Sequence, residues 1–190
     1  QRPHPPIVVT AILPHSNGIA AAAARGWTPI SANFVQPWVV ATHWPKYVEG
    51  CARGGREARG EDWRVARSIF VADDEATLER MTRTPGNIFA QYFRNLQRKS
   101  AAGRGNAVFK HDPALPDEAL TDEYLVDTML TSGTVGEVVD KLLAFREAIG
   151  PFGTLLYCGH DWGDPAAMRR SMQLMAEEVL PRVNRALGET

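Results

Sequence analysis

The chain has 190 residues, of which 44% are hydrophobic, and its 21 basic residues nearly balance its 22 acidic ones. This length and apolar content suffice for one substantial core, and a charge close to zero gives no sign of nucleic-acid binding. No apolar run approaches the roughly 18 residues of a membrane-spanning helix, and the N-terminus carries no signal-peptide pattern. We therefore expect one cytoplasmic domain over residues 1–190, with neither a membrane nor a nucleic acid as partner.

The cysteines and histidines are scattered along the chain. Cys51 and Cys158 lie far apart, so the sequence contains neither a CxxC motif nor a disulfide framework. The five histidines lack the close spacing that metal ligands show in motifs such as HExxH. The sequence therefore predicts no metal site.

The first regular unit is a strand, a turn and a helix. Branched apolar residues over Ile7–Leu13 predict a strand buried on both faces of a parallel sheet, and the five alanines that follow favour a closely packed helix. Ser16 and Asn17 in the turn are good N-cap residues, and the free N–H groups at a helix N-terminus attract phosphate. The turn is thus a candidate phosphate site, although most capped turns of this kind are plain scaffold.

Three more strand–helix units follow. Their predicted strands are residues 28–34, 63–72 and 153–159, and helices are expected through Cys51, over Ala76–Arg83 and from Pro165. Alternating strands and helices indicate a parallel α/β fold, and four units are half of the eight that a (β/α)₈ barrel requires. Arg64 and Arg67 in the third strand are expected to be solvated or paired with carboxylates.

A long insertion, residues 85–127, interrupts the pattern before the last unit. It begins with an aromatic helix around Ile88–Gln97 and continues through stretches rich in glycine, arginine, proline and aspartate. An excursion of this length is usually a functional lid or an interaction segment. Beyond it, Thr134 and Glu137 form a capping box for a helix that runs through Ala148.

Six segments carry a family resemblance by their order along the chain. They are Ala-Ile-Leu-Pro-His-Ser-Asn-Gly, Arg-Gly-Trp-Thr-Pro-Ile-Ser-Ala-Asn-Phe, Trp-Arg-Val-Ala-Arg-Ser-Ile-Phe-Val-Ala-Asp, Gly-His-Asp-Trp, Arg-Arg-Ser-Met and Ala-Glu-Glu-Val-Leu-Pro-Arg. Together they resemble the carboxyl-terminal half of the bacterial luciferase-like flavin-dependent monooxygenases. The resemblance implies four βα units that form the C-terminal half of a TIM barrel, with reduced FMN at the carboxyl ends of the strands.

The resemblance also implies site residues. In this family the loop after the fifth barrel strand helps to hold the flavin phosphate, and here that loop is His15, Ser16, Asn17 and Gly18. The other strand ends that open onto the same face carry Asn33, Phe34 and His160. His160 is the candidate catalytic residue, exchanging a proton with substrate or flavin; the alternative is a histidine held only by its neighbours. Trp38 and Trp162 wall the substrate pocket or merely cover the rim of the barrel.

The activity implied is monooxygenation, in which reduced flavin takes up O₂ as a peroxyflavin and oxygenates a small organic substrate. The reduced FMN would come from a separate flavin reductase. Two alternatives stay open: a non-catalytic partner subunit on the same scaffold, and a deazaflavin (F420)-dependent oxidoreductase. Because four strands cannot close such a barrel, we expect an incomplete enzyme that needs its missing amino-terminal half or a second copy of this chain.

Overall fold

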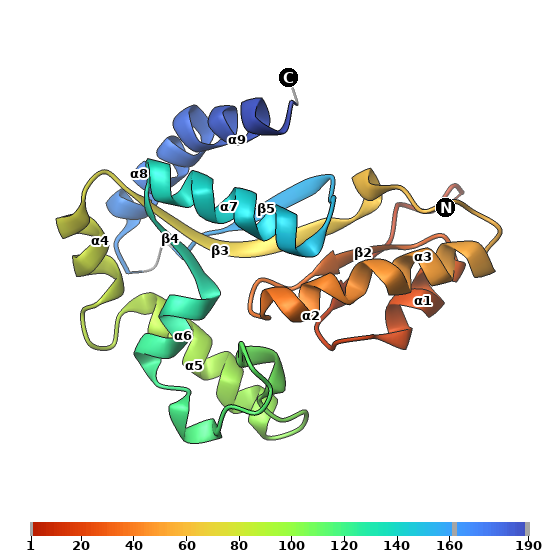
Figure 1. Cartoon of the computed structure of the whole chain (residues 1–190), viewed down its shortest axis with the longest axis horizontal. Helices are drawn as coiled ribbons and strands as arrows, with labels where there is room; N and C mark the ends of the chain where they lie inside the picture. Colours follow the sequence, from red (N-terminus) through yellow and green to blue (C-terminus); the bar gives the residue numbers. More distant parts are fainter. Residues whose placement is uncertain (1, 161–162, 189–190) are drawn as a thin grey trace.

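A parallel sheet runs through the structure, a computed structural model that describes residues 2–160 and 163–188. Its strands are β1 (Val8–Ala11), β2 (Thr28–Ser31), β3 (Arg64–Ala72), β4 (Leu130–Thr134) and β5 (Thr154–Cys158). The long β3 lies at the centre, where β2 and β5 pair with its first part and β4 with its last (Figure 1). β1 pairs with β2, Val8 opposite Thr28. Every pairing is parallel, so the predicted α/β class is confirmed.

Helices cover the sheet on both sides. They are α1 (Asn17–Ala24), α2 (Pro37–Ala41), α3 (His43–Arg53), α4 (Glu75–Thr82), α5 (Ile88–Ala101), α6 (Asp122–Met129), α7 (Val135–Ile149), α8 (Pro165–Leu174) and α9 (Leu180–Leu187). A π-helical turn, Met175–Val179, joins α8 to α9, and short 3₁₀ turns lie at Gly60–Asp62, Ala107–Phe109 and Asp117–Ala119. In Figure 1, α7 and α9 lie above β3, and α5 and α6 lie below it. No helix in the described ranges is both long and apolar enough to cross a membrane.

The four expected strands are present, and β4 is an addition that the sequence did not predict. β4 follows α6 directly and runs straight into α7, without a turn on either side. Its sequence, Leu-Thr-Ser-Gly-Thr, mixes hydroxyl residues with a glycine and shows no strand periodicity. The predicted capping box is confirmed at its end, where the Glu137 carboxylate accepts a hydrogen bond from the backbone N–H of Thr134 at 2.8 Å.

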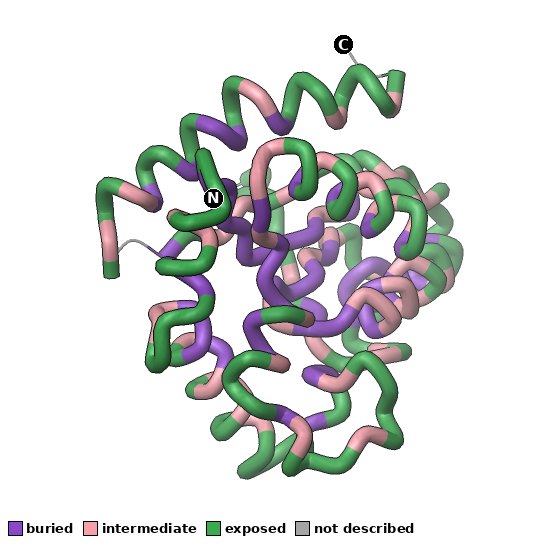
Figure 2. Tube along the Cα trace, turned by 60° about the vertical axis from the view of Figure 1, so that its left-hand side comes forward, coloured by how far each residue is buried: buried purple, intermediate pink, exposed green. Residues whose placement is uncertain are grey.

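The prediction that Ile7–Leu13 is buried on both faces is wrong. Ile7, Val8 and Leu13 are 37%, 40% and 43% exposed. β1 is an edge strand, because within the described residues only β2 pairs with it. Among the described residues, β4 and β5 also have a single neighbouring strand each, β3, and Leu156 of β5 is 47% exposed. Figure 2 shows buried backbone gathered in the middle of the molecule, while the last helices run along its outside with mostly exposed residues.

Part of the insertion 85–127 is folded into the main core. Phe89 and Phe93 of α5, Phe109 and Leu125 are fully buried and belong to the largest apolar cluster, together with Phe70 of β3. The aromatic helix that the sequence predicted is therefore confirmed, and it extends to Ala101. A lid function for this segment stays a prediction.

Close packing of α1 against α3 fixes the first unit. Ala20 and Ala23 of α1 are buried, and they face Gly50 of α3 so closely that a Cβ at Gly50 would lie 2.3 Å from the Ala20 carbonyl oxygen. The alanines were expected to pack closely, and their partner is this helix. The contact sets how α3 sits beside the turn that precedes α1.

We predict that Gly50→Ala lowers the free energy of unfolding by about 1–3 kcal/mol or more, because the added methyl group has no space between two helix backbones. Gly136→Ala in α7 is the matched control, since a Cβ there meets no atom within 4 Å. The control should be neutral or stabilising by up to about 1 kcal/mol, as expected for alanine in a helix. Urea denaturation measures both variants, and equal effects would contradict this account of the packing.

Candidate functional site

A buried polar network joins four separate parts of the chain. Its members are Asn33, which follows β2, Ser68 in β3, Tyr92 in α5 and His160, which follows β5. The Asn33 side-chain amide donates to Ser68 Oγ at 2.8 Å and to Tyr92 Oη at 3.0 Å. Asn33 and His160 were predicted from their places at strand ends, and the parallel sheet brings them together. Ser68 and Tyr92 were not predicted, because the strand and helix patterns around them carry no sign of a shared partner.

The His160 ring meets this network through Nε2. Nε2 lies 3.3 Å from Ser68 Oγ, which also accepts the hydrogen bond from the Asn33 amide. In the neutral tautomer with its proton on Nδ1, Nε2 accepts the Ser68 hydrogen, and this is the form in which His160 presents a basic nitrogen to the network.

Aromatic rings enclose His160. The Tyr92 ring centroid lies 4.3 Å from that of His160, and the Phe89 ring meets it edge-on at 5.5 Å. His160 is only 3% exposed, and this burial lowers its pKa; burial also raises the pKa of Tyr92. Both side chains are therefore neutral at neutral pH, and the histidine is in the form that can accept a proton.

Phe34, a predicted pocket residue, lines a cavity of about 400 Å³ at the carboxyl ends of β1 and β2. Its ring stacks on Phe109, with 6.1 Å between the centroids. Ile12 and Leu96 complete the apolar part of this cavity. α5 forms the opposite wall of the cavity, which the sequence analysis did not identify, and a substrate-binding role for Phe34 stays a prediction.

Of the two tryptophans predicted for the pocket, only Trp38 lies within the described residues. Trp38 lies in the first turn of α2 and packs against the main core, and its indole N–H donates to the Lys110 carbonyl oxygen at 2.8 Å. That bond ties α2 to the middle of the insertion. Trp162 lies outside the described residues. A pocket-lining role for either residue stays a prediction.

The predicted phosphate loop lies between β1 and α1. His15 has a φ of 51°, in the left-handed region, and its N–H donates to Thr42 Oγ1 at 2.9 Å. Ser16 is the N-cap of α1 by its backbone, but its hydroxyl group makes no capping bond. A Cβ at Gly18 would lie 3.3 Å from the Ser16 hydroxyl oxygen, so glycine keeps the space above the first turn of the helix open.

Lys46 of α3 is a cation at this loop that the sequence analysis missed. Its ammonium group donates to Asn17 Oδ1 at 3.0 Å and to the Glu49 carboxylate at 2.9 Å. The spacing of Lys46 and Glu49 is a visible helical pair, but its position opposite Asn17 depends on the packing of α1 on α3. A hydroxyl group, an amide, an ammonium group and a helix N-terminus together suit a phosphate.

His43, a second buried histidine, was not singled out by the sequence. The Trp63 indole N–H donates to Ser31 Oγ at 3.0 Å, and the Ser31 hydroxyl group donates to His43 Nδ1 at 2.9 Å. Nε2 of His43 then donates to the Leu13 carbonyl oxygen at 3.1 Å. This chain of bonds uses both ring nitrogens of a neutral histidine and fixes the end of β1, from which the phosphate loop departs.

The expectation that Arg67 is solvated or paired with a carboxylate is wrong. Arg67 is 4% exposed, and its guanidinium group donates to the carbonyl oxygens of Val35 and Met129 at 3.0 and 3.2 Å. It also lies over the Phe145 ring, 4.9 Å from the centroid. Burial lowers the pKa of Arg67 to about 10, so the side chain is still charged at neutral pH.

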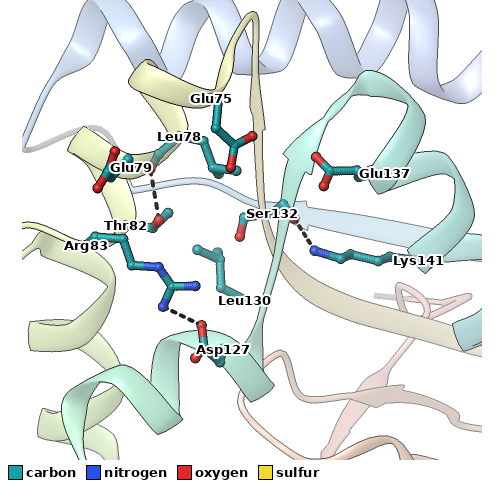
Figure 3. Close-up of a pocket in the computed structure, with 10 residues that line it drawn as sticks. All are labelled: Glu75, Leu78, Glu79, Thr82, Arg83, Asp127, Leu130, Ser132, Glu137 and Lys141. Atoms are coloured by element: carbon teal, nitrogen blue, oxygen red, sulfur yellow. Dashed lines mark hydrogen bonds and ion pairs between the residues drawn. The ribbon is translucent and has the colours of Figure 1, made fainter.

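A second cavity, of about 450 Å³, lies between α4, α6, β4 and α7 (Figure 3). Its two basic groups have partners within the cavity wall: Arg83 donates to Asp127 at 2.6 Å and Lys141 to the Ser132 carbonyl oxygen at 2.6 Å. None of the residues predicted for the site lines it. Within the described ranges, no group of three His, Cys, Asp or Glu side chains could hold a metal ion.

We predict that His43→Gln reduces the pH dependence of stability. Because burial lowers the pKa of His43 to about 4, from 6.5, only the unfolded chain protonates it between these values. The resulting stabilisation, about 3 kcal/mol, is complete above pH 6.5 and is lost as the pH falls toward 4.

Urea denaturation between pH 4 and 7.5 measures this effect: the free energy of unfolding should change less steeply with pH in the variant. His4→Gln, at an exposed position, is the control and should keep the slope of the unaltered protein. Equal slopes for His43→Gln and the unaltered protein would contradict the lowering of the His43 pKa by burial.

Known proteins resemble this chain closely enough to identify its family. It is 28% identical over 182 residues to 3,6-diketocamphane 1,6-monooxygenase of Pseudomonas putida. The matched region covers 94% of this chain and 47% of that protein. The chain is 34% identical over 150 residues to 4-hydroxyprotoasukamycin monooxygenase of Streptomyces nodosus subsp. asukaensis, covering 78% and 38%. The chain thus spans about half the length, or less, of these relatives.

A solved structure and a family match agree with these relatives. The oxygenating constituent of 3,6-diketocamphane monooxygenase from Pseudomonas putida, a type II Baeyer–Villiger monooxygenase solved in complex with FMN, superposes with a TM-score of 0.80 at 27% identity. The match covers 94% of this chain and 49% of that one. Residues 1–150 match the family described as luciferase-like monooxygenase. The chain belongs to the luciferase-like monooxygenase family.

Proposed function

We propose that this chain is the carboxyl-terminal half of an FMN-dependent monooxygenase that oxygenates a small organic substrate with O₂. The observation that carries the proposal is the similarity to a monooxygenase solved with FMN, which extends over 94% of this chain. The buried network of Asn33, Ser68, Tyr92 and His160 supports it, because these residues meet at the ends of parallel strands, where ligands bind in such folds.

The residues of the loop before α1 fit the phosphate of FMN. In this proposal the phosphate lies at the N-terminus of α1, where the Ser16 hydroxyl group and backbone N–H groups donate to it. Lys46 adds a positive charge beside Asn17. His15 and Gly18 shape the loop, the first by its left-handed backbone and the second by its missing Cβ.

His160 would act on protons near the flavin ring and the substrate. Its Nε2 atom accepts a proton, and Ser68 and Asn33 are positioning residues that keep this atom directed into the network. Phe34 supplies apolar surface for the substrate, and the packed insertion excludes water. When bound, reduced FMN supplies the electrons that activate O₂; a separate flavin reductase would deliver it.

The amino-terminal half of the barrel is the partner that we propose for this chain. β1 and β5 each lack a second neighbouring strand in the described structure, and both expose apolar side chains. Unpaired parallel edges favour pairing with further strands. A second copy of this chain would cover the same edges and is the alternative that the experiment below distinguishes.

Activity is tested with the intact protein that contains this chain, supplied with FMN, a flavin reductase, NADH and ¹⁸O₂. We expect ¹⁸O in the product from a cyclic ketone or an alkene. Turnover with reduced F420 alone would identify the deazaflavin alternative, and flavin binding without oxygenation of any substrate would indicate a non-catalytic subunit.

We predict that Ser16→Ala combined with Asn17→Ala, and separately Lys46→Met, weaken FMN binding by about 1–3 kcal/mol through lost bonds to a charged group. Riboflavin, which has no phosphate, should bind all variants equally. Lys141→Met removes a lysine from the cavity of Figure 3 and should leave FMN affinity unchanged. Flavin-fluorescence titration gives the affinities, and unaltered FMN binding in both test variants refutes the assignment of the loop.

We also predict that this chain on its own associates. Half a barrel cannot close its sheet, so its edge strands stay unpaired and can pair with another chain. Light scattering should show oligomers or aggregates, and adding the amino-terminal half should give a one-to-one complex. A stable dimer of this chain that does not bind the added amino-terminal half would favour a second copy as the partner. A monodisperse monomer that binds FMN and turns over alone is incompatible with the half-barrel proposal.

A further inference from the structure

The cavity beside Phe34 has one charged side. Its apolar side comes from the ends of β1 and β2, while its other side is the end of α5 and the turn that follows. That second side contributes the Ser100 hydroxyl group and the two cations Lys99 and Arg104, and no acidic residue lines the cavity. An apolar surface that faces two cations is complementary to an amphipathic anion.

The charge around this cavity is unbalanced. From Ile88 to Lys110 the sequence has five basic residues and no acidic one, although the chain as a whole has a net charge of −1. Two of the five are neutralised, because Arg94 pairs with Asp122 and Lys110 with Asp117. In the described part of the chain, neither Lys99 nor Arg104 forms an ion pair with a carboxylate. A local positive potential is therefore left at the cavity.

The turn that carries Arg104 is held in place. The Ser100 hydroxyl group donates to the Gly105 carbonyl oxygen at 2.8 Å, and the Arg104 N–H donates to the Ser100 carbonyl oxygen at 2.7 Å. Gly105 has a φ of +76°, a conformation that suits glycine. The position of Arg104 thus follows from a closed set of backbone bonds, and less conformational entropy is lost when it binds a ligand.

We propose that this cavity binds the anionic group of an acidic organic substrate, with Lys99 and Arg104 on the carboxylate and Ile12, Phe34 and Leu96 on its apolar body. The inference rests on the proposed function, because it names the substrate class for that site. The flavin phosphate is assigned elsewhere: the loop before α1 makes its contacts with Thr42 and Lys46, on the side of α2 and α3, and none of its residues lines this cavity.

The test compares two probes of equal shape, adamantane-1-carboxylate and adamantane-1-carboxamide. Calorimetry on the intact protein, with and without FMN, should give at least about tenfold tighter binding of the carboxylate, and this preference should fall with added salt. Lys99→Met combined with Arg104→Met should abolish the preference while the carboxamide affinity stays the same. Arg169→Met combined with Arg185→Met removes two exposed cations that do not line the cavity. This control variant should keep the preference for the carboxylate.

Three results would overturn the proposal: equal binding of the two probes, no binding of either, or a preference that survives in the Lys99/Arg104 variant. A fourth would reassign the cations: if that variant loses affinity for FMN but not for riboflavin, they hold the flavin phosphate. The probe measurements need no turnover. Failure of the proposed oxygenation therefore remains distinguishable from failure of this anion site.

Discussion

The pairing of β3 on both of its edges is the constraint on which the rest of the structure depends. Parallel strands of this kind must be covered on both faces, and every residue of β3 after Arg64 is buried. Phe70 and Ala72 enter the main core, whereas Ile69 and Val71 enter the cluster under α7 and α8. A serine within such a strand must find hydrogen-bond partners inside the protein, since an unpaired buried hydroxyl group costs about 1–3 kcal/mol. Asn33 and His160 are those partners, so the candidate site is also how the fold accommodates Ser68.

The two buried histidines differ in what surrounds them. His43 has a hydroxyl group on one ring nitrogen and a backbone carbonyl on the other, within a chain of bonds from Trp63 to Leu13. Protonating His43 would break that chain, which suits a residue that fixes a loop. His160 instead has its Nε2 atom 3.3 Å from Ser68 Oγ, and the Tyr92 ring lies beside it just after the end of β5. A role for His160 in proton exchange stays a prediction.

Local patterns predicted what depends on local structure. Hydrophobic runs identified four strands, and the capping box at Thr134 located the start of α7. The rule that parallel strands end at one edge also brought Asn33 and His160 to the same site. The residues that were missed depend on contacts between distant parts of the chain: Lys46 faces Asn17 only because Gly50 lets two helices approach. Likewise β4 forms because Leu130–Thr134 meets the end of β3, and its own sequence carries no strand signal.

The hydrogen bonds of the buried polar network all lie within this chain, although the sheet that carries it is open at both edges. These bonds join the segment after β2, β3, α5 and the segment after β5. Neither β1 nor β5 contributes a strand residue to the network, so pairing at those edges would not need to rearrange it. The exposed surfaces of Val8 and Leu156 lie instead on the strands that a further part of a barrel would cover. Pairing at these edges would therefore leave the hydrogen bonds of the network in place, and groups that are already held in place bind a ligand at a lower entropic cost.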